Sequence, residues 1–253
     1  MRTRTQRKPG ATSRPSVPCQ VWNKVTIDPA AVKSPSTLLQ VLCVVLSAVL
    51  ASAASLPDVH ALAQSVDQHY NHLRSLQADF TETYRGNGMD RTESGTLWLK
   101  KPGKMRWEYR SPKEKLFLSD GHDAWFYVPG DRQVRKIAMK NLDDLRSPLA
   151  LLLGKTQLEK ELQGLSVAPD VPPLSPGDIV LRGVPKAMAD RVSQVLLEIS
   201  PDSRIVRITL EGQDGAVTEY RFTGQEDNVN ISDQRFKFVP PPDAEVVEGE
   251  FAE

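Results

Sequence analysis

Hydrophobic positions in the stretch that follows Ser55 recur with the period of a helix. They are three, four or seven residues apart, at Val59, Leu62, Val66, Leu73 and Leu76. This spacing gives a helix one apolar stripe. Ser55 and Asp58 fit a capping box, and Pro57 fits the first turn. The pattern therefore predicts an amphipathic helix from Ser55 to Leu76 whose stripe packs against another apolar surface.

From Ala78 onward the period changes to two, which is typical of strands with one buried face. The clearest run places Met105, Trp107 and Tyr109 on one side and Arg106 and Glu108 on the other. Similar runs end at turn signals such as Gly86-Asn87-Gly88, which favours a tight hairpin. They cover residues 78–84, 97–99, 116–118, 124–128, 132–137, 192–199, 204–211, 216–222 and 236–238. This arrangement predicts an antiparallel meander.

Two more helical segments interrupt the strands. Ser147-Pro148 precedes the apolar stretch Leu149–Leu153, and Thr156 with Glu159 forms a capping box for a short helix over 156–162. The stretch 168–177 holds four prolines and predicts a loop within the domain. The acidic tail beyond Pro240-Pro241-Pro242 is expected to fray.

These elements predict a mainly β fold with a few helices, built on one antiparallel sheet of roughly nine to eleven strands. A sheet of this length curls, and the helices then lie across its concave side. We therefore expect an incomplete antiparallel β-barrel, or half-barrel, with a helical lid. Such an interior either packs solid or encloses a hydrophobic cavity, and the pattern alone leaves both possibilities open.

The first 53 residues form a separate segment in sequence terms. Leu38–Leu50 is apolar, follows basic residues and ends in Ala51-Ser52-Ala53, which is typical of a secretory signal peptide. The alternative is an uncleaved anchor, although the run is shorter than the ~20 residues of a membrane span. We expect a leader and signal peptide over 1–53 and one exported domain over 54–253.

The signal peptide accounts for both cysteines and for most of the uneven charge. Cys19 and Cys43 lie before the expected cleavage point, so the exported domain has no disulfide. The leader is basic, which leaves the remainder of this electrically neutral chain net negative. A net negative surface argues against a nucleic-acid partner.

The candidates for catalysis or metal binding are few. His69 and His72 are three apart on the first helix, but no third ligand accompanies them, so a solvated helix face is the favoured interpretation. His122 follows Asp120 in a predicted turn, where such residues usually serve the turn itself. No motif supplies a nucleophile with an oriented base. We expect no enzyme activity, no metal and no cofactor.

The order of several short motifs resembles the LolA family, the periplasmic carriers of outer-membrane lipoproteins. These motifs are Phe80-Thr81-Glu82, Gly95-x-Leu97-Trp98-Leu99-Lys100-Lys101-Pro102, Trp107 then Pro112, Ser119-Asp120-Gly121 with Trp125-Phe126-Tyr127-x-Pro129, Ser147-Pro148, and Phe236-x-Phe238-x-Pro240-Pro241. The resemblance implies a hydrophobic cavity between an incomplete barrel and its helices. It also implies a carrier, expected to be monomeric, that receives acylated lipoproteins from an inner-membrane ABC transporter and delivers them to the outer-membrane receptor LolB.

Three alternatives stay open beside this interpretation. A LolB-type receptor would need a lipidated cysteine, and none is suitably placed. The chain could instead carry or sense another amphiphile, such as a glycolipid or a fatty-acyl ligand. A cavity-free interaction domain would bind no acyl probe at all.

The resemblance also suggests which residues contact lipid. The candidates are the bulky side chains of the strands and of the apolar stretch at 149–153: Phe80, Leu97, Leu99, Met105, Trp107, Tyr109, Trp125, Tyr127, Leu149 and Leu152. The family commonly has an arginine before the proline of the turn after Leu99, where it hydrogen-bonds lid backbone and holds the empty cavity closed. Here that position is Lys101, which lacks the planar five-donor fork of arginine. We expect Lys101 to act as the latch.

Overall fold

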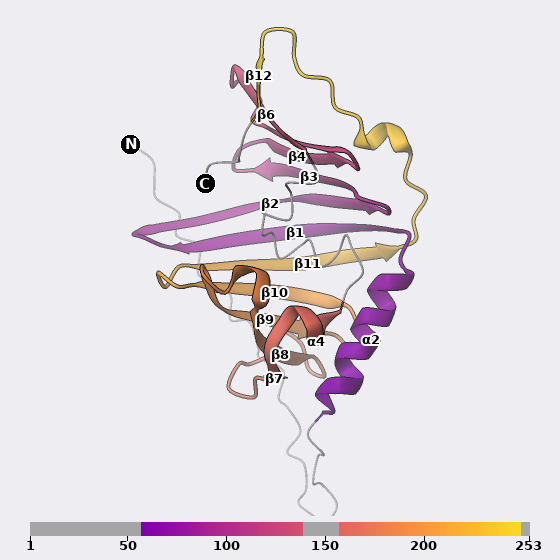
Figure 1. The fold of residues 1–253 in the computed structure, drawn as a ribbon, viewed down its shortest axis with the longest axis vertical. Helices are drawn as coiled ribbons and strands as arrows, with labels where there is room; N and C mark the ends of the chain where they lie inside the picture. Colours follow the sequence, from indigo (N-terminus) through magenta and orange to yellow (C-terminus); the bar gives the residue numbers. More distant parts are fainter. Residues whose placement is uncertain (1–56, 139–156, 249–253) are drawn as a thin grey trace, which may run out of the picture. The chain divides into compact units, whose positions relative to one another are not determined.

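The computed structural model describes residues 57–138 and 157–248, and it begins with helix α2, Val59–His72 (Figure 1). Asp58 is the N-cap, and its carboxylate accepts hydrogen bonds from the backbone N–H groups of His60 at 3.0 Å and Ala61 at 3.3 Å. The helix ends at Leu73, whose backbone is extended. The prediction of a helix is confirmed. However, both predicted ends are wrong, because Pro57 precedes the N-cap Asp58 and Leu76 already belongs to the first strand.

The rest of the described chain is dominated by one twelve-stranded sheet (Figure 1). Its order is β12-β6-β5-β4-β3-β2-β1-β11-β10-β9-β8-β7. The strands are β1 Ser75–Gly86, β2 Met89–Lys100, β3 Lys104–Ser111, β4 Lys115–Asp120, β5 Asp123–Tyr127, β6 Gln133–Ala138, β7 Leu162–Val167, β8 Ile179–Pro185, β9 Val192–Ile199, β10 Ile205–Gly212, β11 Val217–Asp227 and β12 Glu245–Glu248. Short helices α4 Leu158–Glu161, η3 Lys186–Met188 and η4 Asp233–Phe236 lie between them.

The prediction of a mainly β fold on one long, unclosed antiparallel sheet is confirmed, although the described residues form twelve strands rather than nine to eleven. The strands β12 and β7 are its two edges, and every pair is antiparallel except β12 with β6. The helical lid and the enclosed cavity stay predictions. The predicted helix at Leu149–Leu153 lies outside the described residues, as do the predicted signal peptide and Ser55.

The predicted hairpin at Gly86-Asn87-Gly88 joins β1 to β2. Asn87 and Gly88 have φ angles of 53° and 74°. Two successive positive φ angles are the mark of the type I′ turn, whose twist matches that of the flanking strands. The Asn-Gly pair therefore fixes the register of the two longest strands, in which Gly86 pairs with Met89.

Three predictions near the chain's end are wrong. Phe236 lies in the 3₁₀ helix η4 rather than in a strand, because Ser232 caps that turn by accepting from the N–H of Gln234. Phe238 is not in a strand either. The acidic tail does not simply fray, since residues 245–248 form β12 and pair in parallel with β6.

The two faces of the sheet carry separate apolar clusters. The face that packs against α2, called the helix face below, includes Leu97, Trp107, Leu197 and Ile208. Buried α2 residues Ala63, Val66 and Tyr70 complete that cluster. Figure 1 shows α2 beside the β7–β11 half of the sheet. None of the helices in the described part of the chain has the length and hydrophobicity needed to cross a bilayer.

The opposite side is called the outer face. There Trp98, Ile231 and Phe236 form one small cluster, and Ala168, Val180 and Leu196 form another. The second cluster lies against the proline-rich loop 168–177, whose prediction is confirmed. The buried carboxylate of Glu198 fastens this loop by accepting from the N–H of Leu174 and pairing with Arg207 at 2.6 Å. Burial raises the pKa of Glu198.

Candidate lipid-binding face

Strand register gathers five of the predicted lipid contacts on the helix face. Leu97 lies between Ala78 and Trp107, and Leu99 lies between Leu76 and Met105. Directly paired residues on neighbouring strands point to the same side of a sheet. The buried members of the predicted set that share this side are Phe80, Leu97, Leu99, Met105 and Trp107. Tyr109 is partly buried and packs against the same cluster.

An aromatic group forms the centre of this face. The Phe80 ring lies 4.6 Å from that of Trp107 and 4.9 Å from that of Tyr109, both edge-on. Gly95 pairs with both Phe80 and Tyr109 and leaves the space between them open. A Cβ at Gly95 would lie only 2.0 Å from the carbonyl oxygen of Glu108, so no other residue fits there without moving β3. The close approach of β2 and β3 thus depends on this glycine.

Beyond the aromatic group the same face becomes ionic. The Tyr109 hydroxyl donates to Glu82 Oε2 at 2.7 Å, and Lys115 Nζ donates to Glu93 Oε2 at 2.5 Å. Arg91 Nε lies 3.2 Å from the same Glu93 oxygen. Glu82 and Glu93 are cross-strand partners and both are buried. Two carboxylates and two cations balance, which lets the charges stay in a largely apolar surrounding.

The two tyrosines of this ionic end are held neutral. Burial raises the pKa of Tyr109 well above its usual value, and the Glu82 charge adds to that effect. Burial likewise raises the pKa of Tyr220, which also hydrogen-bonds Glu82. Both hydroxyls therefore act as hydrogen-bond donors rather than anions at any physiological pH.

This ionic end was not predicted from the sequence. The alternation of β1 places Glu82 in phase with Ala78 and Phe80, on the side that is apolar elsewhere. A carboxylate in phase with an apolar face is the signal that points to such a cluster, because it must find a partner when buried. Finding Glu93 and Tyr220 as those partners requires the strand register.

Trp107 carries the one unusual polar atom of the apolar part. Its side chain is 2% exposed, and its indole Nε1 is buried without a hydrogen-bond partner in the described part of the chain. Phe80 and Phe222 flank the ring, the latter with centroids 6.2 Å apart. An unpaired buried N–H is costly, by roughly 1–3 kcal/mol.

The structure does not bring Trp125 and Tyr127 to this face. Their β4 partners Leu118 and Leu116 alternate with Phe117, which pairs with Trp107. Trp125 and Tyr127 therefore lie on the outer face, where both rings contact Phe238. The remaining predicted contacts, Leu149 and Leu152, lie outside the described residues.

Lys101 contacts the end of α2. Its Nζ donates to the backbone carbonyl oxygen of Tyr70 at 2.6 Å, and its own N–H donates to the Arg74 carbonyl at 2.9 Å. Burial lowers the pKa of Lys101. A cation at a helix C-terminus is favourable because the unpaired carbonyls carry partial negative charge. Lys101 thus ties α2 to the turn between β2 and β3.

Tyr70 links the same helix to the other half of the sheet. Its buried hydroxyl accepts from the N–H of Ile205, at the start of β10, at 2.9 Å. Burial raises the pKa of this hydroxyl. Through one residue, α2 is therefore fixed both to β10 and, by way of Lys101, to the β2–β3 turn.

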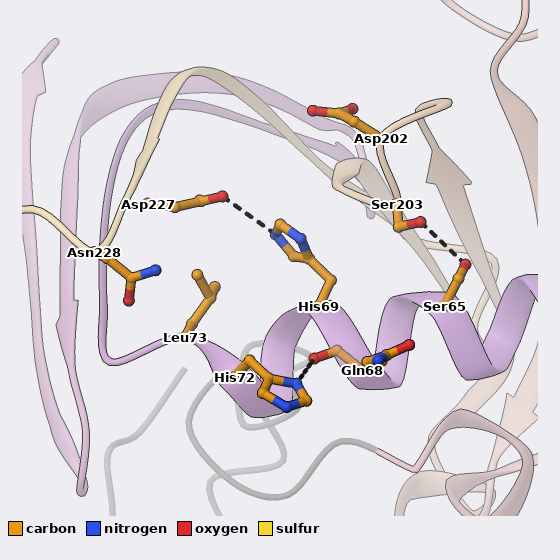
Figure 2. A pocket seen from close by; sticks show the side chains of 9 residues that line it. All are labelled: Ser65, Gln68, His69, His72, Leu73, Asp202, Ser203, Asp227 and Asn228. Atoms are coloured by element: carbon orange, nitrogen blue, oxygen red, sulfur yellow. Dashed lines mark hydrogen bonds and ion pairs between the residues drawn. The ribbon is translucent and has the colours of Figure 1, made fainter.

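A polar pocket of about 400 Å³ lies on the flank of α2 (Figure 2). It is lined by Ser65, Gln68, His69, His72, Leu73, Asp202, Ser203, Asp227 and Asn228. Figure 2 shows His69 directed toward Asp227, 3.5 Å between Nε2 and Oδ2, and His72 turned back to the carbonyl of Gln68. The two histidines do not converge, and the described residues contain no cluster suited to a metal ion.

This pocket differs in character from the helix face. Arg204 joins its two acids, with Nε 2.9 Å from Asp202 Oδ2 and Nη2 3.2 Å from Asp227 Oδ2. Eight of its nine lining residues are polar or charged, whereas the helix face is lined mainly by hydrophobic side chains. His122, the remaining candidate, is an exposed turn residue whose N–H donates to Asp120 Oδ1 at 2.8 Å, as expected for an Asx turn.

Known proteins resemble the chain over most of its length. The family model "Outer membrane lipoprotein carrier protein LolA" matches residues 71–239. A protein of Alkalilimnicola ehrlichii named outer-membrane lipoprotein carrier protein is 32% identical over 222 residues, which cover 86% of this chain and 96% of the relative. One of the same name from Nitrosospira multiformis is 30% identical over 188 residues, covering 72% and 86%.

Among solved structures, a LolA superfamily protein of Nitrosomonas europaea aligns over 72% of this chain and 98% of its own. Its identity is 12% and its TM-score 0.41, too low to add an argument. The family model and the two relatives establish the family without the solved structures. The chain belongs to the LolA family.

Proposed function

We propose that this protein is a periplasmic carrier that shields the acyl chains of lipoproteins and brings them to the outer membrane. The observation that carries the proposal is the continuous apolar helix face of β1, β2 and β3, which continues through Phe222 into β11. The family relationship supports it, since the relatives are named outer-membrane lipoprotein carrier proteins.

The energetics explain why such a face is needed. Each acyl CH₂ that leaves a membrane for water costs about 0.8 kcal/mol, so a multiply acylated protein does not cross an aqueous space unaided. A carrier must offer apolar surface of similar extent. We propose that Phe80, Leu97, Leu99, Met105 and Trp107 supply part of it.

Loading and delivery complete the proposal. The carrier receives its cargo from an inner-membrane ABC transporter and passes it to an outer-membrane receptor of the LolB type. The signal peptide predicted over residues 1–53 brings it to the periplasm, where it acts as a monomer.

A release assay tests the carrier role. Spheroplasts with labelled, newly made lipoproteins are incubated with the protein purified after export. We expect outer-membrane lipoproteins in the soluble fraction, in complex with the protein. An equal amount of an unrelated periplasmic protein is the control. Absence of release contradicts the lipoprotein role, and binding of a fluorescent fatty acid without release would favour a carrier or sensor of another amphiphile.

The Lys101 contact gives a second test. We propose that Lys101 acts as a latch by holding α2 through the Tyr70 carbonyl. Replacing it by leucine removes a charge-assisted hydrogen bond of about 1–2 kcal/mol. Lys101→Leu is expected to accelerate lipid uptake and release by about five- to thirtyfold in stopped-flow fluorescence.

The matched control is Lys101→Arg, which keeps a cationic donor at the helix end. It is expected to retain rates near those of the wild type. Unchanged rates in Lys101→Leu would show that the contact is structural only and that the latch proposal is wrong.

A further inference from the structure

On the helix face, the side chains of four neighbouring strands change from apolar to polar, and they do so in the same direction along each strand. From one end to the other, β1 presents Leu76, Ala78, Phe80 and then Glu82, and β2 presents Leu99, Leu97, Gly95 and then Glu93. β3 follows with Met105, Trp107 and Tyr109. In β11, Phe222 pairs with Phe80 and Tyr220 pairs with Glu82. The face is therefore itself amphiphilic, with an apolar half and an ionic half.

Trp107 lies at the boundary between these halves. Its ring contacts Phe80 on the apolar side and lies 6.1 Å from that of Tyr220, a member of the ionic end. Its N–H has no acceptor in the described part of the chain, whereas the neighbouring donors Tyr109, Lys115 and Arg91 all have carboxylate partners. An uncharged, buried and unpaired donor thus lies where the apolar half of the helix face ends.

In an acylated lipid the atoms at that boundary are ester or amide carbonyls. These carbonyls lie between the hydrocarbon tail and the polar head, and their oxygens accept hydrogen bonds. A lone water is a poor substitute, because a buried water needs two to four polar partners and Phe80 and Phe222 flank the indole. A carbonyl oxygen satisfies the N–H while its own chain continues over the apolar half.

We propose that the Trp107 N–H binds an ester or amide carbonyl of the acyl ligand and so fixes the ligand's direction on the helix face. The tails lie toward Leu76, Leu99 and Met105, and the head lies toward the Glu82–Glu93 pair. The balanced charges of the ionic end suit an uncharged linkage rather than a free carboxylate. This inference rests on the proposed function, since it assigns a polar contact within the same acyl-binding face.

Two lipids that differ only in their carbonyls test the proposal. Dipalmitoylglycerol has two ester carbonyls, whereas di-O-hexadecylglycerol has chains of the same length joined by ethers. We expect the wild-type protein to bind the diester about three- to tenfold more tightly, the range that one net hydrogen bond gives. Trp107→Phe keeps an aromatic ring without the N–H, and it is expected to bring the ratio close to one.

Trp98 provides an internal control in the same protein. Its indole N–H already donates to Gln77 Oε1 at 2.8 Å on the outer face. In protein labelled with ¹⁵N-tryptophan, the Trp107 indole resonance is expected to shift with the diester and not with the diether. The Trp98 resonance is expected to stay in place with both. This measurement needs no variant, so it holds even if Trp107→Phe does not fold.

The outcomes separate this inference from the carrier role. Equal binding of both lipids by the wild type, with an unmoved Trp107 resonance, overturns the carbonyl contact and leaves the carrier role standing. Binding of neither lipid overturns the acyl-binding face itself. A diester preference that survives in Trp107→Phe also overturns the contact, because another group would then be the donor.

Discussion

Trp98 and Trp107 belong to neighbouring strands, and they show how differently the two faces of one sheet are built. Both are buried, with 6% and 2% of their surface exposed. On the outer face, the Trp98 N–H donates to Gln77 and the Arg235 guanidinium lies 4.3 Å from the centre of its ring. On the helix face, the Trp107 N–H has no acceptor among the described residues, and Phe80 and Phe222 flank its ring.

Other polar side chains of the outer face are also hydrogen-bonded or ion-paired within the protein. Thr96 Oγ1 donates to Asp79 at 2.7 Å, and Lys100 donates to the Ile231 carbonyl at 2.7 Å. Asp233 accepts from both Lys100 and Lys104. The lysine contacts join η4 and the segment before it to β2 and β3, and the Thr96 contact joins β2 to β1. The difference teaches that these polar groups of the outer face are paired within the protein, whereas the apolar half of the helix face holds an unpaired donor, which we propose binds a ligand.

The largest loss of stability is expected from removing the Phe236 ring from the outer-face cluster that it forms with Trp98 and Ile231. Phe236 is fully buried against Trp98 and Ile231. Phe236→Ala is expected to lower the free energy of unfolding by about 3 kcal/mol, as typical for a buried phenylalanine, while affinity for acyl lipid stays unchanged. Urea unfolding and a lipid-binding titration measure the two quantities.

Its neighbour Lys237 is exposed and provides the control. Lys237→Ala is expected to change stability by less than about 0.5 kcal/mol. A loss of lipid affinity in Phe236→Ala under conditions where the protein stays folded would break the division between the faces.

A smaller loss of stability is expected from leaving the Trp98 N–H without an acceptor, as the Trp107 N–H is. Gln77→Ala removes the acceptor of the Trp98 N–H and leaves a buried donor unpaired. The expected cost is about 1–2 kcal/mol in the free energy of unfolding. Gln77→Glu keeps an acceptor oxygen and is expected to lose much less. Equal stability of the two variants would show that an unpaired indole is cheap in this sheet, which would weaken the argument built on Trp107.

The smallest effect concerns the pH dependence of stability at α2, which packs against the helix face. His60 Nδ1 lies 2.9 Å from Glu159, and this hydrogen bond raises the pKa of His60. A raised pKa means that the contact stabilises the fold below the ordinary pKa of histidine and is lost as the pH rises through the raised value. The contact joins α2 to α4, the helix just before β7.

Thermal unfolding of the wild type and Glu159→Gln checks this sign. The wild type is expected to melt slightly higher at about pH 5.5, and the difference is expected to vanish at about pH 8. Because both side chains are exposed, added salt should reduce the difference at the lower pH. A difference that grows toward pH 8 would contradict the assignment.

Local patterns predicted most of the strands, and their failures have physical reasons. Leu73 and Leu76 continue the helical spacing of Val66 but lie where the chain has already become extended, because the two periods overlap there. Phe236 and Phe238 alternate like a strand, although the Ser232 cap selects a 3₁₀ turn. The strand β12 is defined by a partner more than a hundred residues away, which no local pattern can contain.

The site shows the same limit in another form. Alternation established that Trp125 and Tyr127 share a side, but choosing the side requires the register through β3, β4 and β5. The ionic cluster of Glu82, Glu93 and Tyr220 is spread over three strands, so only pairing assembles it. The family resemblance indicated a contact between Lys101 and backbone, whereas its partner Tyr70 could be identified only from the packing of α2. The latch role of Lys101 stays a prediction.

The strand order has a consequence for how the protein folds. Strands β1 to β6 form one meander of local hairpins, and β7 to β11 form another. The two meet at the β1–β11 pairing, which joins residues 132 to 151 positions apart and is entropically costly to close. We therefore expect each meander to form early and the seam between them to set the folding rate. Phe80 pairs with Phe222 and Glu82 pairs with Tyr220 across that seam. The proposed lipid-binding face is therefore complete only when the two meanders have joined, and a half-folded chain has no finished site to occupy.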